Sequence, residues 1–220
     1  MPEVKEKTAK KVADHLYWDS RVDTSDIIIE VAEEKVKLTG TVPDYNMRGI
    51  AEDDALSVSG VKSVDNQLTV KSSLGVKAPT DELIKSNIEN ALSYNPNIDF
   101  SKISISVDNG EVELTGSVDA YWKKIVVEEQ VAGISHVREL DNKLTVVPTN
   151  TVHDKSIAEK IVKTMERNKW IDVDSIDVKV EKGVVTLSGT VFNWAAYKGA
   201  SGAAQYTEGV TDVINNLKYQ

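Results

Sequence analysis

Apolar and polar residues follow two periods along this chain, and the same succession of periods occurs three times. Apolar residues spaced four apart come first, and two stretches of alternating apolar and polar residues follow. The four-residue step predicts an amphipathic helix, and the alternation predicts two strands that each bury one face. The middle copy is the clearest, with Ile84, Ile88 and Leu92 on the helix and strands at residues 103–107 and 112–118.

The second strand of every copy closes on a Leu-Thr/Ser-Gly-Thr/Ser-Val motif, and an asparagine follows the motif glycine after 26 residues. The glycines and their asparagines are Gly40 and Asn66, Gly116 and Asn142, and Gly189 and Asn215. The motif recurs after 76 and then 73 residues. A fixed spacing inside a recurring unit indicates three copies of one small domain.

Each copy continues with a second helical segment and a short final strand. A strand, a helix and another strand form a crossover, so the last strand should run parallel to the one before the helix. We therefore predict an α+β fold of three tandem α-β-β-α-β units, each a small three-stranded mixed sheet with two helices packed on one face. The predicted units span residues 1–72, 78–148 and 151–220, joined by short linkers at 71–79 and 147–151.

The motif glycines fall on the buried phase of the second strand, where glycine weakens a strand unless backbone must pass close or a bulge is needed. We expect a helix to pack directly over each of them; contact with a ligand is the alternative. The hairpin turns hold Asn109-Gly110 and Lys182-Gly183 in the second and third copies. The first copy has Glu33-Glu34-Lys35 without glycine, which predicts a looser turn or one of another type.

These motifs resemble the BON domain, the unit named for the bacterial osmotically inducible protein Y and nodulation proteins. The resemblance includes a Gly-Val-x-x-Val-x-Asn-x-Leu segment, which begins at Gly60 and at Gly209. The second copy has His136 in place of that glycine. If the position requires a positive φ, His136 forms a strained or altered cap at the end of the preceding helix.

The resemblance implies a non-enzymatic binding module of the bacterial envelope and of osmotic stress. Association with phospholipid is the activity usually proposed for such domains, and some members associate with potassium or with other envelope proteins. These properties are implied by the resemblance alone.

Charge and composition narrow the choice of partner. The net charge of −9 argues against nucleic acid, because phosphate contacts need clustered Lys and Arg. Residues 1–75, 76–150 and 151–220 carry formal charges of −4, −5 and 0, so only the third unit could approach an anionic surface without net repulsion. The chain has no cysteine for disulfides or thiolate metal sites.

The sequence has no run of 18 apolar residues, so no transmembrane segment is predicted. The first residues hold no apolar signal region. As written, the chain is expected in the cytoplasm, or in the periplasm if a signal was removed. His15, His136 and His153 occupy unrelated places in the three copies and are expected to be solvated. Nothing suggests a hydrolytic triad, so no enzyme activity, metal or cofactor is expected.

Trp170 lies just after the first helix of the third copy and follows several basic residues in the sequence. The candidate lipid-binding residues are Trp170, Lys163, Arg167 and Lys169. An indole beside cations suits a lipid interface, where an amphipathic ring and positive charges meet headgroups. The alternative is that Trp170 covers the core of its own unit.

The leading hypothesis is a non-catalytic binding or scaffold protein of the envelope or of osmotic stress that associates with anionic phospholipid or envelope proteins. A soluble cytosolic potassium-responsive or protein-binding module is the alternative. A third hypothesis is self-assembly through exposed strand edges, which leaves an oligomer open.

Overall fold

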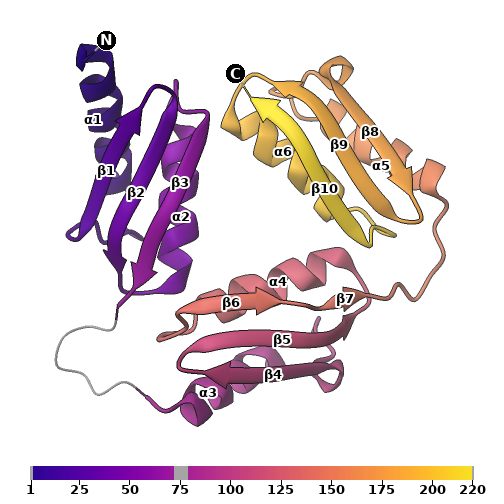
Figure 1. The fold of residues 1–220 in the computed structure, drawn as a ribbon. Helices are drawn as coiled ribbons and strands as arrows, with labels where there is room; N and C mark the ends of the chain where they lie inside the picture. The colour runs from indigo at the N-terminus through magenta and orange to yellow at the C-terminus, as the bar shows by residue number, and fades with distance from the viewer. Residues whose placement is uncertain (1, 72–78, 220) are drawn as a thin grey trace. The chain divides into compact units, whose positions relative to one another are not determined.

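Three repeats of helix, strand, strand, helix and strand make up the computed structural model, which describes residues 2–71 and 79–219 (Figure 1). The first repeat consists of α1 (Pro2–Trp18), β1 (Ile27–Ala32), β2 (Lys35–Val42), α2 (Tyr45–Ser57) and β3 (Ser63–Val70). The second consists of α3 (Asp81–Ser93), η1 (Phe100–Lys102), β4 (Ile103–Asp108), β5 (Glu111–Val118), α4 (Tyr121–Ala132), β6 (Glu139–Asn142) and β7 (Thr145–Val146). The third consists of α5 (Asp154–Glu166), η2 (Val173–Ser175), β8 (Ile176–Glu181), β9 (Val184–Val191), α6 (Trp194–Gln205) and β10 (Asp212–Tyr219).

The sheets have the predicted mixed topology. In the first repeat, β1 is antiparallel to β2 and β3 is parallel to β2. The third repeat has the same order, with β9 between β8 and β10. In the second repeat the last strand is interrupted, so β6 and β7 both lie beside β5. The predicted α+β class is confirmed, while residues 72–78 of the predicted first linker lie outside the described residues.

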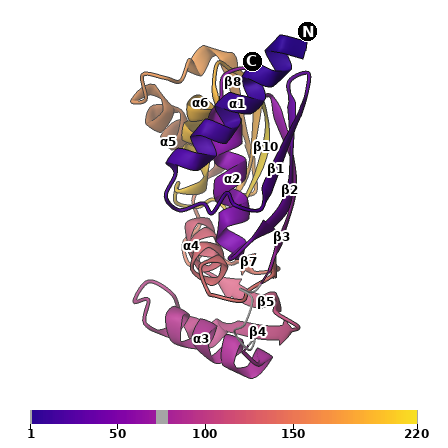
Figure 2. The same ribbon diagram turned by 90° about the vertical axis from the view of Figure 1, so that its left-hand side faces the viewer.

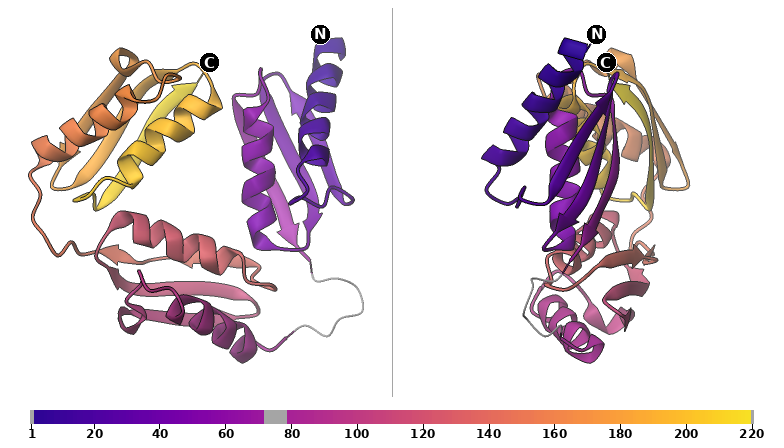
Figure 3. Two further views of the ribbon diagram at one scale, coloured as in Figure 1. Left: turned by 180° about the vertical axis from the view of Figure 1, so that it is seen from behind. Right: turned by 60° about the vertical axis from the view of Figure 1, so that its left-hand side comes forward.

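Both helices of each repeat lie on one face of its sheet. Figure 2 shows α1 and α2 on the same side of β1, β2 and β3. Viewed from behind, the helices of every repeat lie in front of the strands (Figure 3). In the third repeat the core forms where α5 meets the sheet, and Ile157, Ile161 and Met165 are fully buried against Val185 and Leu187.

The motif glycines are required because their backbone is left-handed and a neighbouring carbonyl group approaches them closely. The expectation that a helix packs directly over them was wrong. All three have positive φ, at 114°, 114° and 123°. A Cβ added to Gly40, Gly116 or Gly189 would lie 1.9, 2.0 or 2.1 Å from the carbonyl oxygen of Asp26, Lys102 or Ser175, respectively. That carbonyl belongs to the residue just before the first strand of the repeat. Only glycine leaves room for so close an approach.

All three hairpins have two-residue turns, but the turns differ in type. In the second and third repeats both turn residues have positive φ: Asn109 (51°), Gly110 (79°), Lys182 (53°) and Gly183 (80°). Positive φ at both positions is what a type I′ turn requires. In the first repeat only Glu33 has positive φ, at 58°, so this turn is of another type, as predicted. It has the same length as the other two turns.

A carboxylate at the start of the first helix holds the type I′ turns. Asp81 accepts hydrogen bonds from the N–H groups of Asn109 (2.7 Å) and Gly110 (2.9 Å). Asp154 binds the two residues of its own turn in the same way, at 2.8 and 2.9 Å. The first repeat has Lys5 at this position and also lacks the turn glycine. The acid and the turn glycine therefore occur in the same two repeats, where both turn residues have positive φ and both N–H groups bind one carboxylate.

His136 occupies the glycine position at the end of the second helix and has a φ of 72°. Gly60 and Gly209, at the corresponding positions, have φ values of 95° and 91°. The prediction of a strained helix end is therefore confirmed. A left-handed conformation at a residue with a Cβ costs roughly 1–2 kcal/mol.

Candidate functional site at the end of the third repeat

The turn after α5 exposes Trp170 and buries its neighbour. The side-chain oxygen of Asn168 accepts a hydrogen bond from the N–H of Trp170 (3.1 Å), and its carbonyl accepts one from the N–H of Ile171 (3.0 Å). Ile171 is 8% exposed and joins the core, whereas Trp170 is 59% exposed. The alternative that Trp170 covers the core of its own unit was therefore wrong.

The same turn recurs in the other repeats. The side-chain oxygens of Asp19 and Asn95 accept hydrogen bonds from the N–H groups of Arg21 (2.9 Å) and Asn97 (3.0 Å). An Asp or Asn that binds the backbone two residues on is a common way to fix a turn. In each repeat the residue that follows this hydrogen-bonded N–H is buried, so the turn itself directs the position of Trp170 outward. An alignment of the repeats would have indicated this, because polar residues occupy that position in the other two.

Three cations precede this indole closely in the sequence, and none of them has an ion pair among the described residues. Lys163 and Arg167 are four residues apart and lie on one side of the helix end. The amino group of Lys169 lies 4.9 Å from the centre of the Trp170 ring, within the range of a cation–π contact. Within the described part of the chain none of the three cations pairs with a carboxylate, whereas Lys160 of the same helix binds Glu208 at 3.1 Å.

Acidic residues lie in the same stretch and limit its charge. Glu166, Asp172 and Asp174 balance the three cations, so residues 163–174 have a formal charge of zero. The corresponding residues 14–25 of the first repeat have a formal charge of −2. The carboxylate of Asp172 accepts a hydrogen bond from the N–H of Asp174 at 3.3 Å. The third repeat thus presents free cations beside an exposed indole without an excess of positive charge.

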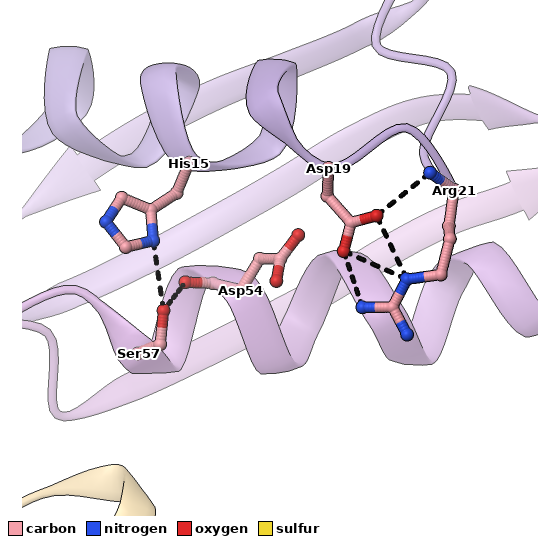
Figure 4. Close-up of polar contacts among 5 residues, drawn as sticks. All are labelled: His15, Asp19, Arg21, Asp54 and Ser57. Atoms are coloured by element: carbon pink, nitrogen blue, oxygen red, sulfur yellow. Dashed lines mark hydrogen bonds and ion pairs between the residues drawn. The ribbon is translucent and has the colours of Figure 1, made fainter.

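The same place in the first repeat holds a self-contained polar cluster (Figure 4). The guanidinium of Arg21 binds both carboxylate oxygens of Asp19, with Nε 2.9 Å from Oδ1 and 3.1 Å from Oδ2. These hydrogen bonds lower the pKa of Asp19 to about 2. Trp18 is 80% exposed nearby in the sequence, but the cation beside it is already paired. The first repeat therefore offers an exposed indole without a free cation at this turn.

His15 and Ser57 meet in this cluster but do not form a nucleophilic pair. The Ser57 hydroxyl donates to the carbonyl of Asp54 (2.6 Å) and lies 3.2 Å from Nδ1 of His15. Because its one proton is committed to the carbonyl, the hydroxyl can only accept from His15 (Figure 4). One carboxylate oxygen of Asp54 is buried without a partner, and burial raises the pKa of this residue.

The motif asparagines bind the free edge of the last strand. Lys71 donates its N–H to the Val42 carbonyl at 3.0 Å, so the N–H of Leu68, three residues earlier, points away from β2. The side-chain oxygen of Asn66 accepts this N–H at 3.2 Å. Its amide nitrogen donates to the Arg48 carbonyl of α2 at 2.7 Å. One side chain thus ties the outer edge of β3 to the helix above it.

The other repeats keep this arrangement with one difference. Asn142 accepts from the N–H of Leu144 (3.2 Å) and donates to the Lys124 carbonyl of α4 (3.2 Å). Asn215 accepts from the N–H of Leu217 at 3.1 Å, but its amide nitrogen is buried without an acceptor. The bond to the strand edge is therefore the part that all three asparagines share.

None of the helices within 2–71 and 79–219 combines the length and hydropathy needed to cross a bilayer. Over those ranges, His, Cys, Asp and Glu side chains do not gather in groups of three or more that could hold a metal ion.

The repeated fold defines a class of protein built from small tandem α-β-β-α-β domains. The sequence model of the BON domain matches residues 5–72, 80–148 and 153–220, and the chain belongs to this family. It is similar to osmotically-inducible protein Y of Escherichia coli strain K12, with 28% identity over 74% of this chain and 90% of the relative. It is also 27% identical to a protein in the gshII 5′ region of Anaplasma centrale, over 54% of this chain and 82% of the relative.

Among solved structures the chain matches CdsD, a structural protein of the type III secretion system of Chlamydia trachomatis. The match has 16% identity and a TM-score of 0.27, and it covers 96% of this chain and 91% of CdsD. A likeness at this level carries no argument about the fold or function of this chain.

Proposed function

We propose that this protein is a non-catalytic binding or scaffold protein of the bacterial envelope in osmotic stress, and that it associates with anionic phospholipid through its third repeat. The similarity to an osmotically inducible protein supports the setting. One observation carries the choice of ligand: Trp170 is exposed with Lys169 over its ring, and neither Lys169 nor the preceding Lys163 and Arg167 has an ion pair in the described residues.

The chemistry of this surface suits a headgroup layer. An indole places an apolar ring and a polar N–H at the boundary between acyl chains and water. Each cation close to an anionic membrane contributes about 1 kcal/mol, and this contribution falls with salt. Because three acidic residues share the stretch, we expect weak binding that depends on both salt and the indole.

Sedimentation of the full chain with vesicles tests the proposal. Vesicles of phosphatidylcholine alone are compared with vesicles that also contain phosphatidylglycerol, at low and moderate salt. We expect the chain to pellet with the anionic vesicles only, and less so as salt rises. Trp170→Ser should weaken the binding roughly tenfold, equivalent to 1.4 kcal/mol.

Trp18→Ser is the matched control, because Trp18 is exposed but lacks a free cation at its turn. It should bind like the unsubstituted chain. Equal binding by the Trp170→Ser variant and the unsubstituted chain would contradict this site, and no pelleting under any condition would contradict lipid association.

A second candidate function is a response to monovalent cations in the first repeat. It is favoured by the unpartnered buried oxygen of Asp54, which lies beside the Asp19–Arg21 pair. Potassium should then raise the thermal stability more than sodium does at constant ionic strength, and Asp54→Asn should abolish the difference. Equal responses to the two ions would remove this candidate.

A further inference from the structure

We infer that Phe192 is a second membrane anchor, so that the third repeat meets the bilayer with one end of its domain and inserts two aromatic side chains. This inference rests on the proposed function, because it concerns the same surface and the same anionic lipid partner. It adds a residue from a different element, the connection between β9 and α6.

Phe192 is exposed although its neighbours are fixed. Val191, the last residue of β9, is 2% exposed, and Asn193 caps α6 by accepting the N–H of Ala196 at 2.8 Å. An apolar residue just before the cap commonly packs on the fourth residue of the helix, here Tyr197. Tyr197 stacks on Trp194, with ring centres 4.6 Å apart, and Phe192 is nevertheless 65% exposed.

The topology brings Phe192 and Trp170 to the same end of the domain. Ile176, the first residue of β8, pairs with Gly189 near the end of β9 (Figure 1). The turn that carries Trp170 precedes β8, and Phe192 follows β9 directly. The turn also lies against α6, since a Cβ added to Gly199 would be 2.6 Å from the amide nitrogen of Asn168.

The other repeats lack this combination. Pro43 and Asp119 occupy the position of Phe192 in the first and second repeats. At the same end of the sheet, Thr69 and Thr145 donate hydrogen bonds to the motif glycine carbonyls at 3.3 and 3.0 Å. The third repeat has the cation Lys218 there instead. Trp170, Phe192 and the extra cation thus occur together on the one repeat without net negative charge, whereas the exposed aromatic pair of the first repeat, Tyr17 and Trp18, lies on a repeat with net negative charge.

Two anchors on one rigid domain reinforce each other. Once one aromatic ring is inserted, the second is held at the interface and inserts without a separate binding event. We expect Phe192→Ser to weaken binding to vesicles of phosphatidylglycerol and phosphatidylcholine about tenfold, as Trp170→Ser does, and the double variant about a hundredfold, if the two losses add. Phe192→Leu, which keeps an apolar side chain, should retain most of the affinity.

The matched control is Tyr206→Ser. Tyr206 is 58% exposed and follows the last residue of α6, at the opposite end of the same domain. It should bind as the unsubstituted chain does. Thermal unfolding of every variant shows whether the repeat stays folded, and the Leu and Ser variants of Phe192 separate loss of apolar contact from loss of fold.

The outcomes separate the inference from the function beneath it. If Trp170→Ser weakens binding while Phe192→Ser behaves like Tyr206→Ser, the second anchor is wrong and lipid association stands. If Phe192→Leu loses as much as Phe192→Ser, apolar insertion at this position is also wrong. If the unsubstituted chain fails to bind anionic vesicles, both the proposed function and the inference fall.

Discussion

In the first repeat the outward residue of the turn after the first helix is Arg21, and in the third repeat it is Trp170. Both turns are held by a side-chain oxygen two residues earlier, and both direct the next residue into the core. The guanidinium of Arg21 is bound to Asp19, whereas Trp170 is exposed beside unpaired cations. The comparison teaches that one backbone arrangement can carry a closed polar cluster or an open amphipathic surface, and that the backbone alone does not decide which.

The largest expected effect concerns what the two repeats share. Gly189→Ala, or Gly40→Ala in the first repeat, should destabilise its repeat by about 2–4 kcal/mol, because the new Cβ meets a carbonyl oxygen and the φ is positive. Urea unfolding measures the loss. Gly202→Ala is the control: it lies within α6 with open space around its Cβ and should stabilise by up to about 1 kcal/mol. A loss of stability in Gly202→Ala as large as that in Gly189→Ala would show that the nearby carbonyl oxygen is not the reason for glycine at the motif position.

An exchange of the outward residues tests what the repeats do not share. Trp170→Arg should weaken binding to anionic vesicles roughly tenfold, or 1.4 kcal/mol. Arg21→Trp in the same chain should not restore it, because that substitution leaves Asp19 unpaired and adds no cation. Vesicle sedimentation measures both variants. Recovery in the double variant would mean that any exposed indole suffices and that the neighbouring cations are irrelevant.

The second repeat extends the comparison to a strained position. His136→Gly should stabilise the protein by about 0.5–1 kcal/mol, since relief of the positive φ exceeds the extra freedom that glycine gives the unfolded chain. Thermal unfolding monitored by circular dichroism measures the change. His153→Gly controls for loss of an imidazole where φ is −70° and should not stabilise. An unchanged or lower stability for His136→Gly would show that the imidazole makes compensating contacts.

The smallest expected effect is that of pH on the first repeat. Burial, and then the charge of Asp19, raise the pKa of Asp54 in the folded chain. The folded state therefore binds a proton at the Asp54 carboxyl more tightly than the unfolded state does. The protonated carboxyl favours the folded state at low pH, and this contribution to stability is lost as pH rises through the raised pKa. Asp54→Asn should add about 0.5 kcal/mol at neutral pH after allowance for solvent screening. It should also flatten the pH dependence between acidic and neutral conditions in urea titrations, and an unaltered slope would contradict the shift.

The sequence predicted the fold well because its patterns are local. Alternation around Asn109-Gly110 gave the hairpin, and the constant distance from glycine to asparagine gave the repeat. The positive φ of His136 followed from the glycines at the corresponding positions. What could not be predicted depends on contacts between elements: the carbonyl that approaches Gly40, and the carboxylate of Asp81 on a turn 28 residues away.

The sequence predicted which residues form the candidate site, but not which way their side chains point. Trp170 and the cations around it were identified from their order in the chain, whereas the exposure of the indole follows from the Asn168 turn. Phe192 gave no signal of its own, because a single phenylalanine between a strand and a helix normally belongs to the core. The structure leaves it 65% exposed, which the spacing of apolar residues does not reveal.

The asparagine at the outer strand of each repeat also affects how a tandem chain folds. Three similar strands on one chain are held at effective concentrations of about a millimolar, far above those of separate molecules. Tethered copies of one domain are prone to exchange strands and misassemble while they fold. Each asparagine oxygen binds an N–H group on this edge that a strand from another copy could otherwise bind, at Leu68, Leu144 and Leu217. The residue that marks the repeat in the sequence thus also occupies a backbone group on the outer strand edge, through which a strand of another copy could otherwise pair.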